Sequence, residues 1–295
     1  MRHVVVQGGT DGIGRELVLS HLRRGDRVLA LGRAEAKGAD LAGRAGELGA
    51  GDRFSFLAAD LSAIGENLRV IETIRSEFER VDVLVLCARH YSSARRESVD
   101  GIELTFALFY LSRFLLCHGL AGLMRNAGTA VVVNVAGPGG RPEWLSWDDL
   151  ALTRDYEGQR ALLQCGVAND LLGLALAEQY GPAGIQHVLV NPGMVSTGFS
   201  GDYDPATAAQ VERMKRMGMP VAQAVEPLLA IIDSPPGEHL SAFSAGTPMD
   251  ADSLPAMDRD AAARLAELSR RMIEDSHPGG WAVVGEPPDH GLRGS

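Results

Sequence analysis

Three glycines near the start of the chain have the spacing of a phosphate-binding turn. Gly8, Gly12 and Gly14 follow the apolar run Val4 to Val6 and precede an amphipathic segment. A parallel strand that ends in such a turn lets the backbone approach a pyrophosphate, which then lies at the positive end of the next helix. The spacing predicts a dinucleotide site, and the alternative is an ordinary connection between a strand and a helix.

Two cations bear on which dinucleotide would bind. Arg33 follows a second apolar segment, residues 27–31, and Lys37 comes one turn later. In a dinucleotide fold the residue at this strand end reaches the adenosine ribose, and a guanidinium there can bind a 2′-phosphate through two hydrogen bonds. The pair therefore favours NADP(H) over NAD(H). The alternative is two solvated charges at the start of a helix.

The elements that must position these residues alternate along the chain. Strands separated by helical segments indicate a parallel sheet that is covered on both faces. We therefore predict an α/β fold, a Rossmann-type doubly wound parallel sheet of about seven strands with helices on both faces. One dinucleotide-binding domain is expected over residues 1–275, and the Gly- and Pro-rich residues 276–295 are expected to form a loosely ordered tail. The strands are expected at residues 4–6, 27–31, 54–58, 81–86, 129–135 and 240–243, and a further strand is expected just before Pro192 and Gly193.

Composition restricts the class of function. Of 295 residues, 45% are hydrophobic and 22% are charged, which is typical of a globular protein, and the net charge of −10 argues against a nucleic-acid partner. Cys117 and Cys165 are far from each other and from Cys87, so no metal site or disulfide framework is recognised. No signal peptide is evident, and the longest apolar run, residues 104–111, is too short to span a bilayer. We expect a cytoplasmic protein without a membrane partner.

The first turn, with Ile13 between its last two glycines, resembles that of the short-chain dehydrogenase/reductase family. Residues 166–172 resemble the K-L-A-N-x-L-L segment of the retinol-dehydrogenase-like branch, and residues 192–197 match the family's P-G-x-V-x-T turn. The resemblance covers roughly residues 1–245. It implies a nicotinamide dinucleotide cofactor, a small-molecule substrate, and a homodimer or homotetramer. In the family, a residue at the position of Asp60 binds the adenine amine. The implied cofactor-binding positions are Gly8, Thr10, Gly12, Ile13, Gly14, Arg33, Asp60, Leu61, Cys87, Ala88, Pro192, Gly193, Val195 and Thr197.

The family's proton donor has no obvious counterpart in this chain. In the family, hydride addition to a carbonyl leaves an alkoxide that a Tyr protonates, and a Lys four residues later lowers the pKa of that Tyr. Tyr156 and Arg160 imitate the pair. The register of residues 166–172, however, places Leu162 at the Tyr position and Gly166 at the Lys position. The resemblance therefore implies that the acid is absent.

Two further functional positions of the family are also replaced. The same alignment places Phe109 where the family has an Asn that holds a catalytic water, and Gly137 where a Ser binds the substrate carbonyl. The loss of a general acid alone typically lowers the rate about 10²–10⁴-fold. We therefore do not expect ordinary ketone reduction by the family's mechanism.

The residues after the fourth predicted strand could supply other groups. Where the family has N-N-A-G, this chain has Cys87, Ala88 and Arg89, followed by His90 and Tyr91. A guanidinium, an imidazole and a phenol would then lie where the nicotinamide pocket begins, so Arg89, His90 and Tyr91 are candidate catalytic residues. The alternative is a surface loop whose polar side chains point away from the cofactor.

The helix expected over residues 101–122 is apolar over more than one stripe of its surface. Such a surface favours a helix that packs on the sheet with one side and on another subunit with the other. This expectation agrees with the oligomer that the family resemblance implies.

These observations favour an atypical NADP(H)-binding oxidoreductase. Its substrate would be a small metabolite that stabilises its own anion, such as a quinone or a conjugated carbonyl compound. Two alternatives stay open. One is a non-redox protein that keeps the pocket as a cofactor-dependent regulator or partner, and the other is a cyclase or dehydratase that reuses the fold.

Overall fold

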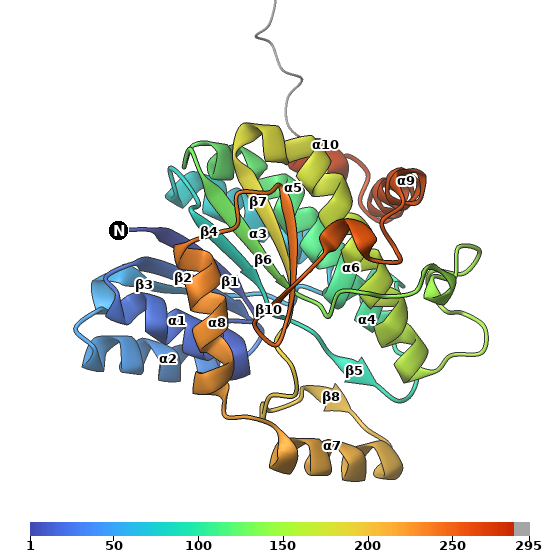
Figure 1. Ribbon diagram of the computed structural model, residues 1–295, viewed down its shortest axis with the longest axis horizontal. Helices are drawn as coiled ribbons and strands as arrows, with labels where there is room; N and C mark the ends of the chain where they lie inside the picture. Colours follow the sequence, from blue (N-terminus) through green and yellow to red (C-terminus); the bar gives the residue numbers. More distant parts are fainter. Residues whose placement is uncertain (286–295) are drawn as a thin grey trace, which may run out of the picture.

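A mostly parallel sheet forms the centre of the computed structural model, which describes residues 1–285 (Figure 1). The strand order is β10-β9-β7-β6-β4-β1-β2-β3, and every neighbouring pair is parallel except β9 with β10. The predicted doubly wound α/β fold is confirmed. The strands are β1 (His3–Gln7), β2 (Arg27–Gly32), β3 (Phe54–Ala58), β4 (Val83–Leu86), β6 (Ala130–Val135), β7 (Ile185–Asn191), β9 (Leu240–Ser244) and β10 (Thr247–Met249).

The main sheet has eight strands within residues 1–285, rather than about seven. The additional strand is β10, which folds back on β9 through a turn at Ala245 and Gly246. Both turn residues have positive φ, 47° and 79°. A two-residue turn of this kind matches the twist of an antiparallel pair. The strand β10 was not predicted because Ala is not among the residues that commonly signal such a turn.

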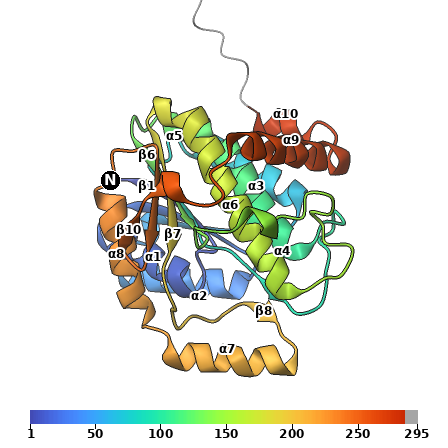
Figure 2. The ribbon, with the colours of Figure 1, turned by 45° about the vertical axis from the view of Figure 1, so that its right-hand side comes forward.

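Apolar side chains on both faces of the strands explain the layered arrangement (Figure 2). In β1, Val4 and Val6 enter one core while Val5 enters the other, since successive side chains of a strand point to opposite faces. The first core packs on α1 (Gly12–Arg23), α2 (Glu35–Glu47) and α8 (Val221–Asp233). The second core packs on α3 (Ile64–Glu77), α5 (Ser112–Arg125) and α6 (Gly158–Tyr180).

A long apolar helix crosses the second core, in three parts: α4 (Leu104–Phe106), a π-helical turn (Ala107–Leu111) and α5. Ser112 and Arg113, the two polar residues that follow the apolar run of residues 104–111, are fully buried within this helix. By length and composition alone, this helix and the segment Gly158–Ala183 could cross a membrane. Their apolar windows are 94% and 72% buried inside the chain, so core packing accounts for their composition.

The C-terminal helices cover the outer side of this long helix. Ser269 of α9 (Arg259–Ser276) lies 2.8 Å from the Tyr110 hydroxyl, and Trp281 of α10 (Gly280–Val284) lies 5.5 Å from the ring of Phe114. The apolar surface of the long helix is therefore no reason to expect a partner subunit, because the chain covers this surface itself. The expectation of a loose tail from residue 276 is also wrong as far as Val284, which is fully buried; residues 286–295 lie outside the described part.

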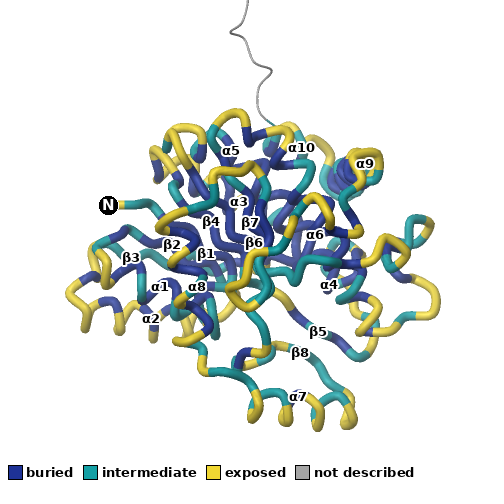
Figure 3. Tube along the Cα trace, in the orientation of Figure 1, coloured by how far each residue is buried: buried dark blue, intermediate teal, exposed yellow. Residues whose placement is uncertain are grey.

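A second, two-stranded sheet joins distant segments beside the main sheet. β5 (Tyr91–Ser92) pairs in parallel with β8 (Gly201–Asp202), which precedes α7 (Pro205–Met217). Figure 3 shows exposed residues along α7 and buried residues along the central strands. Short 3₁₀ turns lie at Gly51–Arg53, Pro142–Trp144, Gly181–Ala183 and Ala251–Ser253.

Candidate active site

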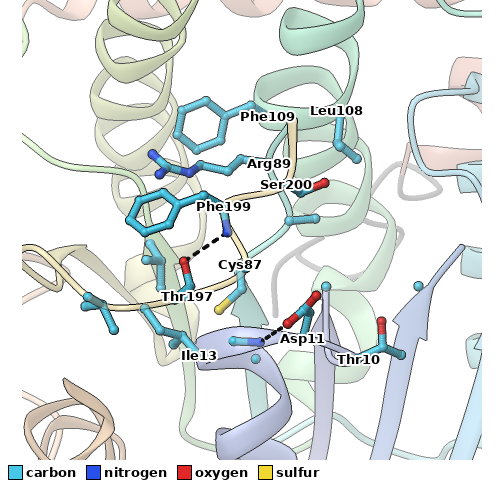
Figure 4. Close-up of a pocket in the computed structure, with 18 of the residues that line it drawn as sticks. Thr10, Asp11, Ile13, Cys87, Arg89, Leu108, Phe109, Thr197, Phe199 and Ser200 are labelled. Carbon is cyan, nitrogen blue, oxygen red and sulfur yellow. Dashed lines mark hydrogen bonds between the residues drawn. The ribbon is translucent and has the colours of Figure 1, made fainter. Parts of the chain in front are cut away.

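A cavity of about 470 Å³ lies where the carboxyl ends of the parallel strands meet (Figure 4). Its walls come from the first turn, from the segments that follow β2, β4 and β6, and from residues 191–200 after β7. In open α/β sheets ligands bind in the crevice at this edge, because the chain turns away from the sheet there and leaves the strand ends accessible. The cavity is therefore the candidate cofactor site.

The first turn can be built only with glycines at two positions. Gly8 has φ of 74°, and a Cβ there would lie 2.8 Å from the backbone nitrogen of Ala88. A Cβ on Gly14 would lie 2.2 Å from the carbonyl oxygen of Gly8. The glycines thus allow the turn to pack against the end of β4 and α1 to pack against the turn. The N-terminal end of α1 faces the cavity, which suits a pyrophosphate.

Thirteen of the fourteen expected cofactor-binding residues line this cavity. The exception is Asp60, whose carboxylate accepts hydrogen bonds from the backbone nitrogen (3.1 Å) and hydroxyl (2.8 Å) of Ser62 instead. The thiol of Cys87 lies in the wall, and burial raises its pKa to about 12, so it is neutral. The residues that line the cavity are Gly8, Thr10, Gly12, Ile13, Gly14, Arg33, Leu61, Cys87, Ala88, Pro192, Gly193, Val195 and Thr197.

On the adenosine side lies the carboxylate of Asp11, which was not among the predicted site residues. Asp11 caps α1 by accepting a hydrogen bond from Gly12 (2.8 Å), and Lys37 forms an ion pair with the same carboxylate. Within residues 1–285, Arg33 lines the cavity with no hydrogen bond or ion pair of its own. Lys37 therefore neutralises Asp11, and Arg33 is the cation left to bind an anion.

A second cavity of about 310 Å³ adjoins the first and shares Arg89, Phe109, Ala136 and Gly137 with it. All four positions that the family alignment singles out line it. They are Phe109, Gly137, Leu162 and Gly166. Of its described lining residues only Arg89 is charged, and none is a Tyr, Lys, Ser or Asn.

Tyr156 and Arg160 are used elsewhere. The Tyr156 hydroxyl donates a hydrogen bond to the backbone oxygen of Ser92 (3.0 Å), and Arg160 donates one to the hydroxyl of Ser146 (2.8 Å). Neither residue belongs to the described lining of either cavity. The two side chains hold the start of α6 against its neighbours and do not converge on the site.

His90 and Tyr91 also turn away from the cavities, which corrects their prediction as catalytic candidates. The imidazole of His90 lies 3.2 Å from the Ser200 hydroxyl and 3.1 Å from the Asp202 carboxylate, and Tyr91 stacks on Tyr203 at 5.5 Å. The pairing of β5 with β8 sets these directions. Both residues attach the segment before α7 to the end of β4.

Arg89 is the one predicted catalytic candidate that reaches the site. It lines both cavities, and its guanidinium points between the rings of Phe109 and Phe199 (Figure 4). Arg89 is exposed, and it faces the two cavities. Desolvation by the surrounding protein lowers its pKa. In the described part of the chain it has no hydrogen bond or ion pair.

A second guanidinium, that of Arg113, interacts electrostatically with this one. Arg113 is fully buried and donates hydrogen bonds to the backbone oxygens of Ala88 (3.0 Å) and Val135 (3.1 Å) and to the side chain of Asn134. Its guanidinium also covers the ring of Phe109 at 4.5 Å. Burial lowers the pKa of Arg113 to about 9, so it stays charged at neutral pH. The signal in the sequence was an Arg within an apolar helix.

A buried carboxyl group fixes the loop that forms the other wall of the second cavity. Asp170 of α6 accepts hydrogen bonds from the backbone nitrogens of Gly139 (3.0 Å) and Gly140 (2.9 Å). Its other oxygen has no partner among the described residues, and burial raises the pKa of Asp170 to about 7. The loop is therefore held by a group that titrates near neutral pH.

Comparison with known proteins indicates one family. The family described as "short chain dehydrogenase" matches residues 2–148. Polyprenol dehydrogenase from Homo sapiens is 29% identical over 203 residues, which are 66% of this chain and 61% of that protein. Retinol dehydrogenase 14 from Mus musculus is 23% identical over 284 residues, covering 92% of this chain and 85% of that protein.

Solved structures support the same fold. A putative uncharacterized protein from Mycobacterium Paratuberculosis has a TM-score of 0.69 at 22% identity, with 93% of this chain and 94% of that chain covered. A short-chain dehydrogenase from Sphingobium yanoikuyae in complex with NADPH has a TM-score of 0.61 at 21% identity, with 82% and 87% covered. At these identities the comparison concerns the fold alone.

Replacing Gly166 by Ala should stabilise the protein by roughly 0.5–1 kcal/mol, since Gly costs about that much in a helix interior. The nearest atom to a Cβ there is the Gly137 oxygen, 4.0 Å away. Urea unfolding measures the change. The matched control is Gly119→Ala in α5, where a Cβ would lie 2.5 Å from buried Ile71 and should destabilise the protein. A destabilised Gly166→Ala variant would show that the space beside Gly166 is not free.

Asp170 should make the protein less stable as pH rises. Its ordinary pKa of 3.8 in the unfolded chain is raised to about 7 in the folded one, so the folded state binds more protons between these values. Asp170→Asn keeps an acceptor for both glycine nitrogens but cannot ionise. Between about pH 5 and about pH 8 the unchanged protein should lose on the order of 2 kcal/mol more stability than the variant. Urea unfolding at both pH values tests this, and equal losses would contradict it.

Proposed function

Because the chain belongs to the short-chain dehydrogenase/reductase family, in its retinol-dehydrogenase-like branch, we propose that it is an oxidoreductase that uses NADP(H). Its substrate is a small metabolite, and the reaction does not use the family's Tyr and Lys. When bound, the cofactor supplies or accepts a hydride.

The larger cavity supports the cofactor assignment. Gly8 and Gly14 leave no room for a Cβ, and the backbone between them approaches the place that a pyrophosphate needs. At the adenosine end, Arg33 is unpaired among residues 1–285, while Lys37 forms an ion pair with Asp11. A free cation with no opposing carboxylate favours a 2′-phosphate, and so NADP(H) over NAD(H). The NADPH complex of the Sphingobium yanoikuyae relative agrees with this proposal.

The smaller cavity carries the proposal about the substrate. Its described lining has no side chain that could deliver a proton at neutral pH, because Leu162 and Gly166 stand where the family has its Tyr and Lys. Hydride addition must therefore leave a negative charge that the substrate itself delocalises, and the proton then comes from water. Quinones and conjugated carbonyl compounds meet this condition, whereas simple ketones do not.

Replacing Arg33 by Ala should weaken NADPH binding roughly 10–100-fold and leave NADH binding nearly unchanged, since a charge-assisted pair contributes about 1.5–3 kcal/mol. Titration calorimetry with both dinucleotides measures the effect. Arg15→Ala is the matched control, because Arg15 pairs with Asp40 at 3.0 Å on the same side and does not line the cavity. Equal losses for NADPH and NADH would remove Arg33 from phosphate recognition.

The substrate proposal is tested by NADPH oxidation against 1,4-benzoquinone, cyclohexenone and cyclohexanone, each corrected for the rate without protein. The quinone and the enone should be reduced at least about 100-fold faster than the saturated ketone, since only the latter needs the missing acid. Comparable rates for all three would contradict the proposal. NADPH binding without any oxidation would instead favour the non-redox alternatives, a regulator or a cyclase or dehydratase.

A further inference from the structure

We propose that Arg89 binds a permanent carboxylate group of the substrate, so that the second cavity selects small apolar carboxylates. The inference rests on the proposed function in one respect, namely that the ligand is a substrate. It is carried by the contacts and charges at the boundary between the two cavities.

Two guanidinium groups, those of Arg89 and Arg113, interact at this boundary, and no described carboxylate pairs with either. Arg113 is bound by neutral oxygens of Ala88, Val135 and Asn134, and Arg89 lowers the pKa of Arg113 further, after the larger effect of burial. Within residues 1–285, neither guanidinium forms an ion pair with a carboxylate. Arg113 is buried without a carboxylate partner, and Arg89 faces the cavity beside it, so an anionic ligand on Arg89 would offset the positive charge there.

The cofactor's own phosphates are poorly placed to fill this role. The residues that suit a pyrophosphate are in the first turn, from Gly8 to Gly14, and Arg33 serves the adenosine end. None of these residues lines the second cavity, whereas Arg89 lines it together with Leu162 and Gly166. Arg89 lines both cavities, and we assign its anion to a ligand of the second one because the phosphate-binding residues lie elsewhere in the first.

The backbone nitrogens of the glycine loop in the second cavity are already occupied. The backbone nitrogens of Gly139 and Gly140 donate to Asp170, and that of Gly137 points to the backbone oxygen of Val190 at 3.3 Å. Arg89 is thus the only charged donor for a ligand in the described lining, where the indole of Trp144 is a neutral one. A guanidinium forms two parallel hydrogen bonds with a carboxylate.

The rest of the lining suits an apolar body attached to that carboxylate. Phe109, Trp144 and Leu162 contribute aromatic and aliphatic surface, and the volume of about 310 Å³ admits a small ring system. With the carboxylate on Arg89, the body of the ligand lies next to the shared wall formed by Ala136 and Gly137. This places it beside the first cavity.

Binding of trans-cinnamate and of its neutral isostere cinnamamide tests the inference. Titration calorimetry is run with the full chain in the presence of NADP⁺, on the unchanged protein and on Arg89→Gln. The unchanged protein should bind cinnamate at least about 10-fold more tightly than cinnamamide, and Arg89→Gln should lose this preference while binding cinnamamide as before. The matched control is Arg141→Gln, because Arg141 lies 6.0 Å from the ring of Trp144 but does not line the cavity. It should keep the preference.

Two results would overturn the inference: cinnamate that binds no more tightly than cinnamamide, or an Arg89→Gln variant that keeps the preference. An Arg89→Lys variant, which retains the charge, guards against misfolding and should keep part of the preference. Because the readout is binding, it does not depend on turnover. A carboxylate preference without NADPH oxidation would refute the proposed reaction alone, and NADPH oxidation without the preference would refute the role of Arg89 alone.

Discussion

The structure depends on one buried cation at the edge of the sheet. Arg113 joins the carbonyl of Ala88, after β4, to that of Val135, at the end of β6, and packs on the ring of Phe109. A guanidinium can do this because its donors spread in a plane, so it reaches two strand ends and a helix at once. The boundary between the two cavities is fixed by these contacts, and so is its positive charge.

The polar residues around the site mostly hold the protein together. Asp170 binds the glycine loop after β6, Tyr156 holds the start of α6, and His90 attaches the segment before α7. Each has found partners within the chain, and a group that is paired in this way is costly to release for chemistry. Arg89 differs because it faces the cavities without a partner among the described residues. Among the described lining residues of the second cavity, Arg89 is the only charged one.

The C-terminal helices bury an apolar helix surface that would otherwise face solvent. α9 and α10 lie over the helix that contains Tyr110 and Phe114, and Trp281 completes that apolar cluster. An apolar helix thus needs no second subunit to exclude water. Composition could not distinguish these two outcomes, because the same apolar stripe is buried equally well by either partner.

The sequence by itself determined the features that depend on neighbouring residues. The spacing of Gly8, Gly12 and Gly14, and the apolar runs of the strands, were sufficient to predict the doubly wound sheet and the place of its dinucleotide site, because turn geometry and strand alternation are local. Most of the other lining residues were implied by the resemblance to the family. The turn at Ala245 and Gly246 was missed because Ala245, with a positive φ, stands where Asn, Asp or Gly is usual.

Only the tertiary structure decided which polar side chains face the site. His90 and Tyr91 follow Arg89 directly, yet the pairing of β5 with β8 turns them toward Asp202 and Tyr203, segments more than 100 residues away. Partners so distant in the chain leave no mark in a local pattern. The physical reason is that hydrogen bonds and ion pairs form between whichever groups the packed core brings together, and that choice is made by the whole fold.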